Sequence, residues 1–173
     1  YGQQGKEDTI ANLEAAGIIV SGGGQLGIFE KNGVKVGMTG YCFPYKDGKK
    51  DISADVKALR EAGCQIVIAS FHWGSEYRDD FTGEQRTIGR AAIKAGADIV
   101  VGTHPHIVQG IEAYQDSYIL YSLGNLVFGG NVDPDDRDAY LARVTFTVYE
   151  DHCDAPELTV VPIRLTALDK GTD

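Results

Sequence analysis

Basic residues and long apolar runs are both scarce in this sequence of 173 residues. There are 16 Lys and Arg against 25 Asp and Glu, and the formal net charge is −9. Because such a surface repels nucleic acid and anionic membranes, we expect no nucleic-acid partner. A membrane span needs about 18 consecutive apolar residues, and no apolar run in the sequence approaches that length. No signal peptide is visible. Since the chain begins at Tyr1, we expect a piece of a longer protein.

Several motifs of common catalytic and cofactor sites are also missing. The three cysteines, Cys42, Cys64 and Cys153, are widely spaced and form no CxxC, which favours free thiols over a disulfide framework or a zinc knuckle. The glycines at Gly22–Gly24 lack the frame of a nucleotide-binding loop, and there is no GxSxG elbow. The acidic run at 133–136 lacks the spacing of a calcium loop and is interpreted as a solvated surface loop.

Helical and strand patterns alternate along the chain. The spacing of apolar residues predicts helices over 5–18, 52–63 and 83–96. Apolar or alternating runs predict strands over 18–20, 26–30, 34–41, 64–71, 97–102, 118–128, 142–150 and 157–168, with a hairpin turn at 31–33. A helix followed by a buried strand, twice in succession, indicates a parallel or mixed α/β sheet, and the two last strands predict a second, antiparallel sheet.

Three of the four histidines stand at predicted strand ends. His72 ends the run "IVIASFH", and His104 and His106 follow "ADIVVGT". Ligands of α/β sheets gather beyond the carboxyl ends of the strands, where three imidazoles would suffice to hold a transition metal. Pro105 restricts the pair to extended or turn geometry, and in extended backbone both rings would face the same side. A packing role for these histidines is the alternative that the spacing leaves open, and His152 is interpreted as a surface residue.

Two polar residues beside these strand ends are further candidates. Glu76, in "HWGSEY", could orient a histidine, ligate a metal or act as an acid or base, and its alternative is a solvated loop carboxylate. Asn125, in "SLGN", could contact a phosphate, an amide or a metal-bound water, and its alternative is an ordinary turn residue after Gly124.

Five segments carry a resemblance to a known family: "TIANLEAAGI", "VGMTGY", "FHWGSEY", "AGADIVVGTHPHIVQGIE" and "ILYSLGNLVF". In this order, from Tyr1 to about Phe128, they resemble the bacterial capsule-synthesis protein family of CapA type, associated with poly-γ-glutamate capsule synthesis. That family is similar to the calcineurin-like metallophosphoesterases. The resemblance implies an α/β fold with a layered α/β/β/α sandwich and a site for two divalent transition metals (Mn, Fe or Zn).

The resemblance also implies roles for individual residues. His72, His104 and His106 would be metal ligands, and Glu76 and Asn125 match family positions from which they would orient water or substrate. The family's first motifs, a strand-end "GD" and an "NNH"-type segment, precede its "YG", and this sequence begins at "YG". We therefore expect residues 1–173 to be a single domain, the C-terminal portion of a metallophosphoesterase-like domain whose N-terminal part is missing. About half of a two-metal site would then be present, because a bridging carboxylate must hold the ions about 3.5–4 Å apart.

The function that the resemblance implies is metal-dependent hydrolysis of a phosphate or amide bond in cell-envelope polymer metabolism. The partners would be an anionic polymer or phosphorylated precursor and capsule-synthesis membrane proteins, and the parent protein would be extracytoplasmic and membrane-anchored. The alternative is a non-catalytic scaffold of a capsule-polymer synthesis or export complex.

Overall fold

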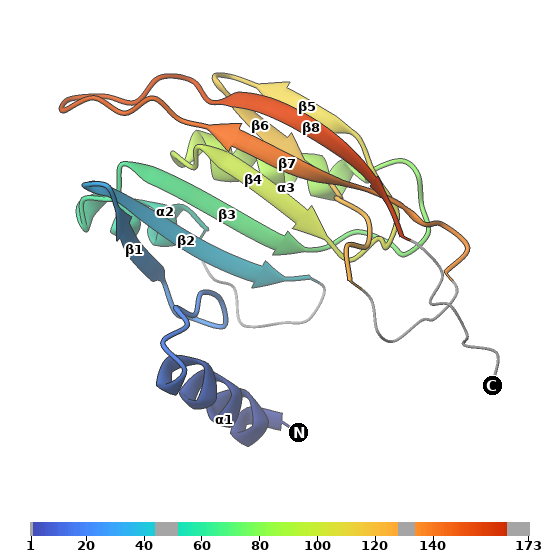
Figure 1. Cartoon of the computed structure of the whole chain (residues 1–173), viewed down its shortest axis with the longest axis horizontal. Coiled ribbons are helices and arrows are strands. Elements are labelled where there is room, and N and C mark those ends of the chain that lie inside the picture. The colour runs from blue at the N-terminus through green and yellow to red at the C-terminus, as the bar shows by residue number, and fades with distance from the viewer. Residues whose placement is uncertain (1, 44–51, 128–133, 166–173) are drawn as a thin grey trace, which may run out of the picture.

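A six-stranded mixed sheet is the centre of the computed structural model, which describes residues 2–43, 52–127 and 134–165. The strand order is β1-β2-β3-β4-β6-β5 (Figure 1). The four inner strands run parallel and are β2 (Val34–Cys42), β3 (Ile66–His72), β4 (Ile99–Thr103) and β6 (Ser117–Leu120). The two edge strands run antiparallel to their neighbours and are β1 (Gly27–Lys31) and β5 (Ile111–Tyr114). The predicted mixed α/β sheet is confirmed.

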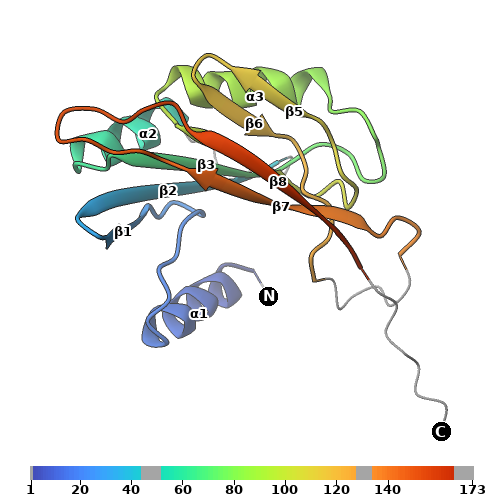
Figure 2. The same cartoon turned by 45° about the horizontal axis from the view of Figure 1, so that its top comes forward.

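Two helices, α2 (Ile52–Glu61) and α3 (Gly83–Lys94), cover one face of this sheet (Figure 2). The buried residues of α2, Val56 and Leu59, lie three positions apart and therefore on one side of the helix. They pack on alternate residues of β3, among them Phe71, in a single buried cluster. This core fixes the parallel strands, and with them the place where their carboxyl ends meet.

A second sheet lies over the other face of the first (Figures 1 and 2). It consists of β7 (Asp138–Thr145) and β8 (Glu157–Arg164), which pair antiparallel as predicted. Between the two sheets is an apolar cavity of about 550 Å³, lined from β7 by Tyr140 and Val144 and from the first sheet by Ile68 and Val101. The helices and the two sheets are thus stacked as layers. The N-terminal helix α1 (Gly2–Ala15) has no buried residue, and the figures show it apart from these layers.

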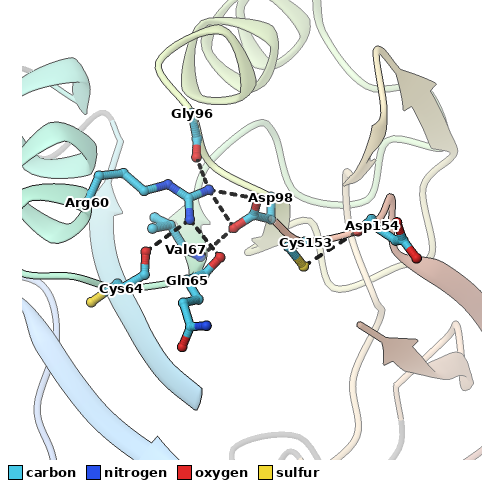
Figure 3. Close-up of polar contacts among 8 residues, drawn as sticks. All are labelled: Arg60, Cys64, Gln65, Val67, Gly96, Asp98, Cys153 and Asp154. Atoms are coloured by element: carbon cyan, nitrogen blue, oxygen red, sulfur yellow. Dashed lines mark hydrogen bonds and ion pairs between the residues drawn. The ribbon is translucent and has the colours of Figure 1, made fainter. Parts of the chain in front are cut away.

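The amino ends of the parallel strands are joined by an ion pair between Arg60 of α2 and Asp98, just before β4 (Figure 3). The guanidinium donates to both carboxylate oxygens, at 2.7 and 2.8 Å, and to the carbonyls of Cys64, Gln65 and Gly96. The carboxylate also accepts from the N–H at the start of β3. Burial raises the pKa of Asp98 above its usual value, against the opposing effect of that N–H and of Arg60. This network ties α2, β3 and β4 at the end of the sheet opposite the histidines.

A second ion pair joins α3 to the edge strand β5. Arg90 bonds to one oxygen of Glu112, and the hydroxyl of the buried Tyr121 donates to the other. Burial alone would raise the pKa of Glu112, but the hydrogen bonds from Tyr121 and Arg90 outweigh it and hold that pKa below its ordinary value of 4.5. The carboxylate is therefore built into the fold in its charged form.

Most of the predicted elements are present with ends shifted by a few residues. The hairpin turn at 31–33 is confirmed, because Asn32 and Gly33 both have positive φ and close a two-residue loop between β1 and β2. The strand predicted at 18–20 is wrong: Ile18 and Ile19 are about half exposed and pair with no strand. None of the described helices is long and apolar enough to cross a membrane.

The predicted strand at 118–128 is interrupted, and its last residue lies outside the described residues. Strand β6 ends at Leu120, after which Leu123 bridges to Val108 and Gly124 bridges to Ala139 at the start of β7. The chain therefore passes from the first sheet toward the second within a few residues. The edge strand β5, which no prediction included, is four residues long. The acidic run at 133–136 falls partly outside the described residues.

Candidate functional site

The predicted histidines meet where the parallel strands β3 and β4 end. His72 is the last residue of β3 and pairs in register with Thr103, the last residue of β4. His104 therefore follows directly beside it, and the two ring centroids lie 4.3 Å apart. The ring of His106 lies 6.0 Å from that of His104. The carboxyl edge of the sheet thus brings the three imidazoles into one cluster.

Glu76 joins this cluster from the loop that follows β3. One ligand atom each from Glu76, His104 and His106 lies within 4.8 Å of the other two. Two imidazoles and a carboxylate are a donor set that suits Zn, Fe or Mn. The structure therefore places Glu76 with the paired histidines, and His72 stands next to this group through its contact with His104.

The backbone of the paired histidines is strained. His104 has φ +99° and His106 has φ +62°, in the left-handed region that side chains other than glycine rarely adopt. Such conformations cost on the order of 1–3 kcal/mol each and persist where the surroundings hold them. Pro105 between them is fully buried, and its carbonyl accepts a hydrogen bond of 2.9 Å from the N–H of Tyr77. The extended arrangement considered from the sequence is wrong, and the alternative of a turn is the one adopted.

Asn125 binds to His106 through both ends of its amide. Its Nδ2 donates to the carbonyl of His106 at 3.0 Å, and its Oδ1 lies 3.0 Å from Nδ1 of the ring. With a proton on Nδ1 donated to Asn125, Nε2 carries the lone pair that a metal requires. The sequence pointed to Asn125 as a contact for water or substrate. The sequence did not reveal that Asn125 orients the ring of a histidine.

The electrostatic setting favours the neutral form of the His72 ring. The pKa of His72 lies below its ordinary value of 6.5, first because burial disfavours the charged ring and then because His104 and His106 stand close. Glu76 opposes this shift. Neutral imidazole is the form that ligates a metal.

Tyr77 is a residue of the site that the sequence did not single out. Its ring stacks on His106 with a centroid distance of 6.0 Å, although the side chain is 56% exposed. Its backbone also lies in the left-handed region, with φ +55°. The only signal in the sequence was its place in "HWGSEY", beside the candidate Glu76.

Comparison with solved structures shows the fold. A structure described as a novel phosphatase from Mycoplasma pneumoniae superposes with a TM-score of 0.50 at 17% identity, covering 79% of this chain and 57% of the other. At this identity the likeness concerns the fold alone. It confirms the predicted layered α/β fold.

Comparison with known sequences shows the family. The PGA biosynthesis protein CapA of Bacillus subtilis (strain 168) is 35% identical over an alignment of 149 positions, and the match covers 74% of this chain and 39% of that protein. The capsule biosynthesis protein CapA of Bacillus anthracis is 30% identical over an alignment of 152 positions, and the match covers 74% of this chain and 37% of that protein. The chain thus spans about two fifths of the length of these relatives. The family described as "Bacterial capsule synthesis protein PGA_cap" matches residues 1–130, and the chain belongs to this family.

Proposed function

We propose that Glu76, His104 and His106, with His72 beside them, bind a divalent transition metal (Mn, Fe or Zn). The reaction proposed is hydrolysis of a phosphate or amide bond in a cell-envelope polymer or its phosphorylated precursor. The observation that carries the proposal is the meeting of two imidazoles and a carboxylate, with ligand atoms within 4.8 Å of one another, at the carboxyl ends of parallel strands. When bound, the metal would supply a water of lowered pKa and polarise the bond under attack.

The surrounding residues have distinct roles in this proposal. Asn125 holds the ring of His106 with Nε2 as the ligand atom, and the buried Pro105 keeps the strained turn in place. The carboxylate of Glu76 is exposed, so it can ligate the metal while one of its oxygens contacts water or substrate. The extracytoplasmic, membrane-anchored location and the capsule-synthesis membrane partners are part of the same proposal, supported by the capsule-related names of the relatives.

A non-catalytic scaffold in capsule-polymer synthesis or export is the second candidate. The observation that favours it is the composition of the donor group: within the described part of the chain it contains one carboxylate, Glu76. Two-metal hydrolysis needs a carboxylate that bridges the ions. A chain that binds an ion at the histidines and cleaves nothing would fit this role.

The first test is the metal content of the protein, purified without chelator and measured by elemental analysis. A bound transition metal is expected in the unmodified chain and in a His152→Ala control, because His152 lies on an exposed hairpin. The metal should be lost in the double variant His104→Ala/His106→Ala. No metal above the level of the double variant would overturn the metal site.

Hydrolysis is tested separately on the metal-loaded protein. A chromogenic phosphodiester and a γ-glutamyl anilide represent the two bond types of the proposal. Metal-dependent release of chromophore from one of them supports the hydrolase, and the double variant should release none. Metal binding without release from either would favour the scaffold.

A further inference from the structure

Two glutamines are buried behind the candidate metal site, and their amides bond to each other. Gln85, in the first turn of α3, is 1% exposed, and Gln109, three residues after His106, is 3% exposed. Nε2 of Gln85 donates to Oε1 of Gln109 at 2.9 Å. Glutamine is seldom buried, since an amide without partners costs about 1–3 kcal/mol in the protein interior. The pair therefore calls for an explanation beyond packing.

The remaining bonds of this pair lead into the loop that carries Glu76. Oε1 of Gln85 accepts from the N–H of Thr82, as part of the capping box that starts α3. Nε2 of Gln109 donates to the carbonyls of Arg78 and Asp80, at 2.8 and 3.3 Å. The side chain of Gln109 thus holds the loop backbone directly after Glu76 and Tyr77.

This loop has few other attachments. Residues 75–80 are all exposed, so side-chain burial does little to fix them. Two further backbone bonds tie the loop to the histidine turn, from the N–H of Trp73 to Thr103 and from the N–H of Tyr77 to Pro105. At Gly74, with φ +81°, an added Cβ would lie 2.7 Å from the amide of Gln85, so the loop runs closely over the glutamine pair.

Gln109 also touches the segment that carries Asn125. Its backbone N–H donates to the carbonyl of Ser122 at 3.1 Å, and the hydroxyl of Ser122 donates to the carbonyl of Ile107 at 2.7 Å. Three segments therefore meet at Gln109: the loop of Glu76, the turn of His104 and His106, and the stretch before Asn125. These are the segments that supply the donors and the residue that orients one of them.

We propose that Gln109 is a positioning residue of the metal site. Its buried amide holds the Glu76 loop against the histidine turn, and so keeps the Glu76 carboxylate within reach of an ion bound by His104 and His106. The inference rests on the proposed function only in that a metal ion binds at this site. The position of the Glu76 loop is a property of the protein without metal and does not depend on the proposed function. The side chain of Gln109 itself does not contact the ion.

The test compares Mn²⁺ affinity in four proteins: the unmodified chain, Gln109→Met, Glu76→Gln and the double variant. Methionine is close in volume to glutamine but donates no hydrogen bond to the loop carbonyls. We expect Gln109→Met to weaken Mn²⁺ binding about tenfold or more, as loss of a residue that orients a ligand commonly does. In the Glu76→Gln background the same change should have little further effect, because its route to the ion is already removed.

The non-additive result separates positioning from a general loss of stability. An equal loss of affinity with and without the Glu76 carboxylate would overturn the proposal, and so would unchanged affinity in Gln109→Met. Gln3→Met, on the exposed helix α1, is the matched control and should bind like the unmodified chain. If Gln109→Met does not fold, Gln109→Asn serves, since it keeps the amide but shortens its reach by one carbon.

Hydrogen exchange of residues 74–81 without metal provides a second measurement. Gln109→Met should exchange these amides at least tenfold faster than the unmodified chain, while peptides from β3 and β4 stay protected. If the unmodified chain binds no Mn²⁺, the metal site fails, and this measurement alone decides whether Gln109 positions the loop. Unchanged exchange in the loop would overturn the inference even if the chain binds the ion.

Discussion

Replacement of Asn125 by alanine is expected to weaken metal binding while leaving the fold intact. The change removes two hydrogen bonds to His106, both of 3.0 Å: one to its ring and one to its carbonyl. At about 0.5–1.5 kcal/mol for each bond, the loss amounts to about 1–3 kcal/mol. If all of it falls on the bound state, the dissociation constant rises about five- to 150-fold, since about 1.4 kcal/mol corresponds to tenfold.

The assay is competition for Zn²⁺ or Mn²⁺ against a fluorescent chelator at pH 7, with urea unfolding of the metal-free protein beside it. Asn12→Ala, on the exposed face of α1, is the matched control and should change neither value. Asn125→Asp retains an acceptor for the ring N–H but places a second oxygen at the His106 carbonyl, so its affinity should lie between those of Asn125→Ala and the unmodified chain. Unchanged affinity in Asn125→Ala would refute the orienting role.

Three further predictions concern the stability of the fold. Arg60→Met leaves the Asp98 carboxylate without its cation and should lower the free energy of urea unfolding by about 2–4 kcal/mol. This is less than for a fully buried pair, because both groups keep some exposure to water. An unchanged urea midpoint would contradict this prediction. Glu112→Gln should cost most near neutral pH, since the pKa of Glu112 is depressed: the stability it contributes is present above pH 4.5 and fades as the pH falls through the lower value of the folded protein. A cost that stays constant between pH 7 and pH 3 would argue against this charge effect. Gly102→Ala places a Cβ 2.1 Å from a backbone oxygen and should cost about 3 kcal/mol or more, whereas Gly83→Ala, with nothing within 4 Å, should unfold like the unmodified chain.

The fold was predictable where a strand is covered on both faces. The apolar runs before His72 and before Thr103 are covered by helices on one face and by the second sheet on the other, and a strand buried in this way shows in the sequence as a continuous apolar stretch. The end of β6 was not predictable in the same way. Leu123 and Gly124 are as apolar as the residues before them, but Leu123 bridges to Val108, which lies in no strand, and Gly124 bridges to Ala139 of β7 in the second sheet. Only the three-dimensional path of the chain distinguishes these two cases.

The sequence predicted which residues form the candidate site better than it predicted their geometry. Strand ends bring histidines together because parallel strands share a carboxyl edge, and this needs no knowledge of side-chain orientation. The alternation that governs a strand fails beyond its end, where His104 and His106 adopt positive φ. That conformation depends on the burial of Pro105 and on a bond from Tyr77, which belongs to another loop. Contacts of this kind join residues far apart in sequence, so a local pattern cannot reveal them.

The net charge of −9 repels any anionic substrate from the protein, so the site must supply a local positive charge to bind one. The site supplies little positive charge of its own: the donor group contains a carboxylate, and the lowered pKa of His72 keeps that ring neutral near pH 7. A bound divalent ion would reverse the local sign, since it is the largest charge in such a site. On the proposed function the ion would therefore serve recognition as well as chemistry. The residues that position the donors, the half-buried Asn125 and the buried Gln109, would then act on substrate affinity through the ion and not by contact.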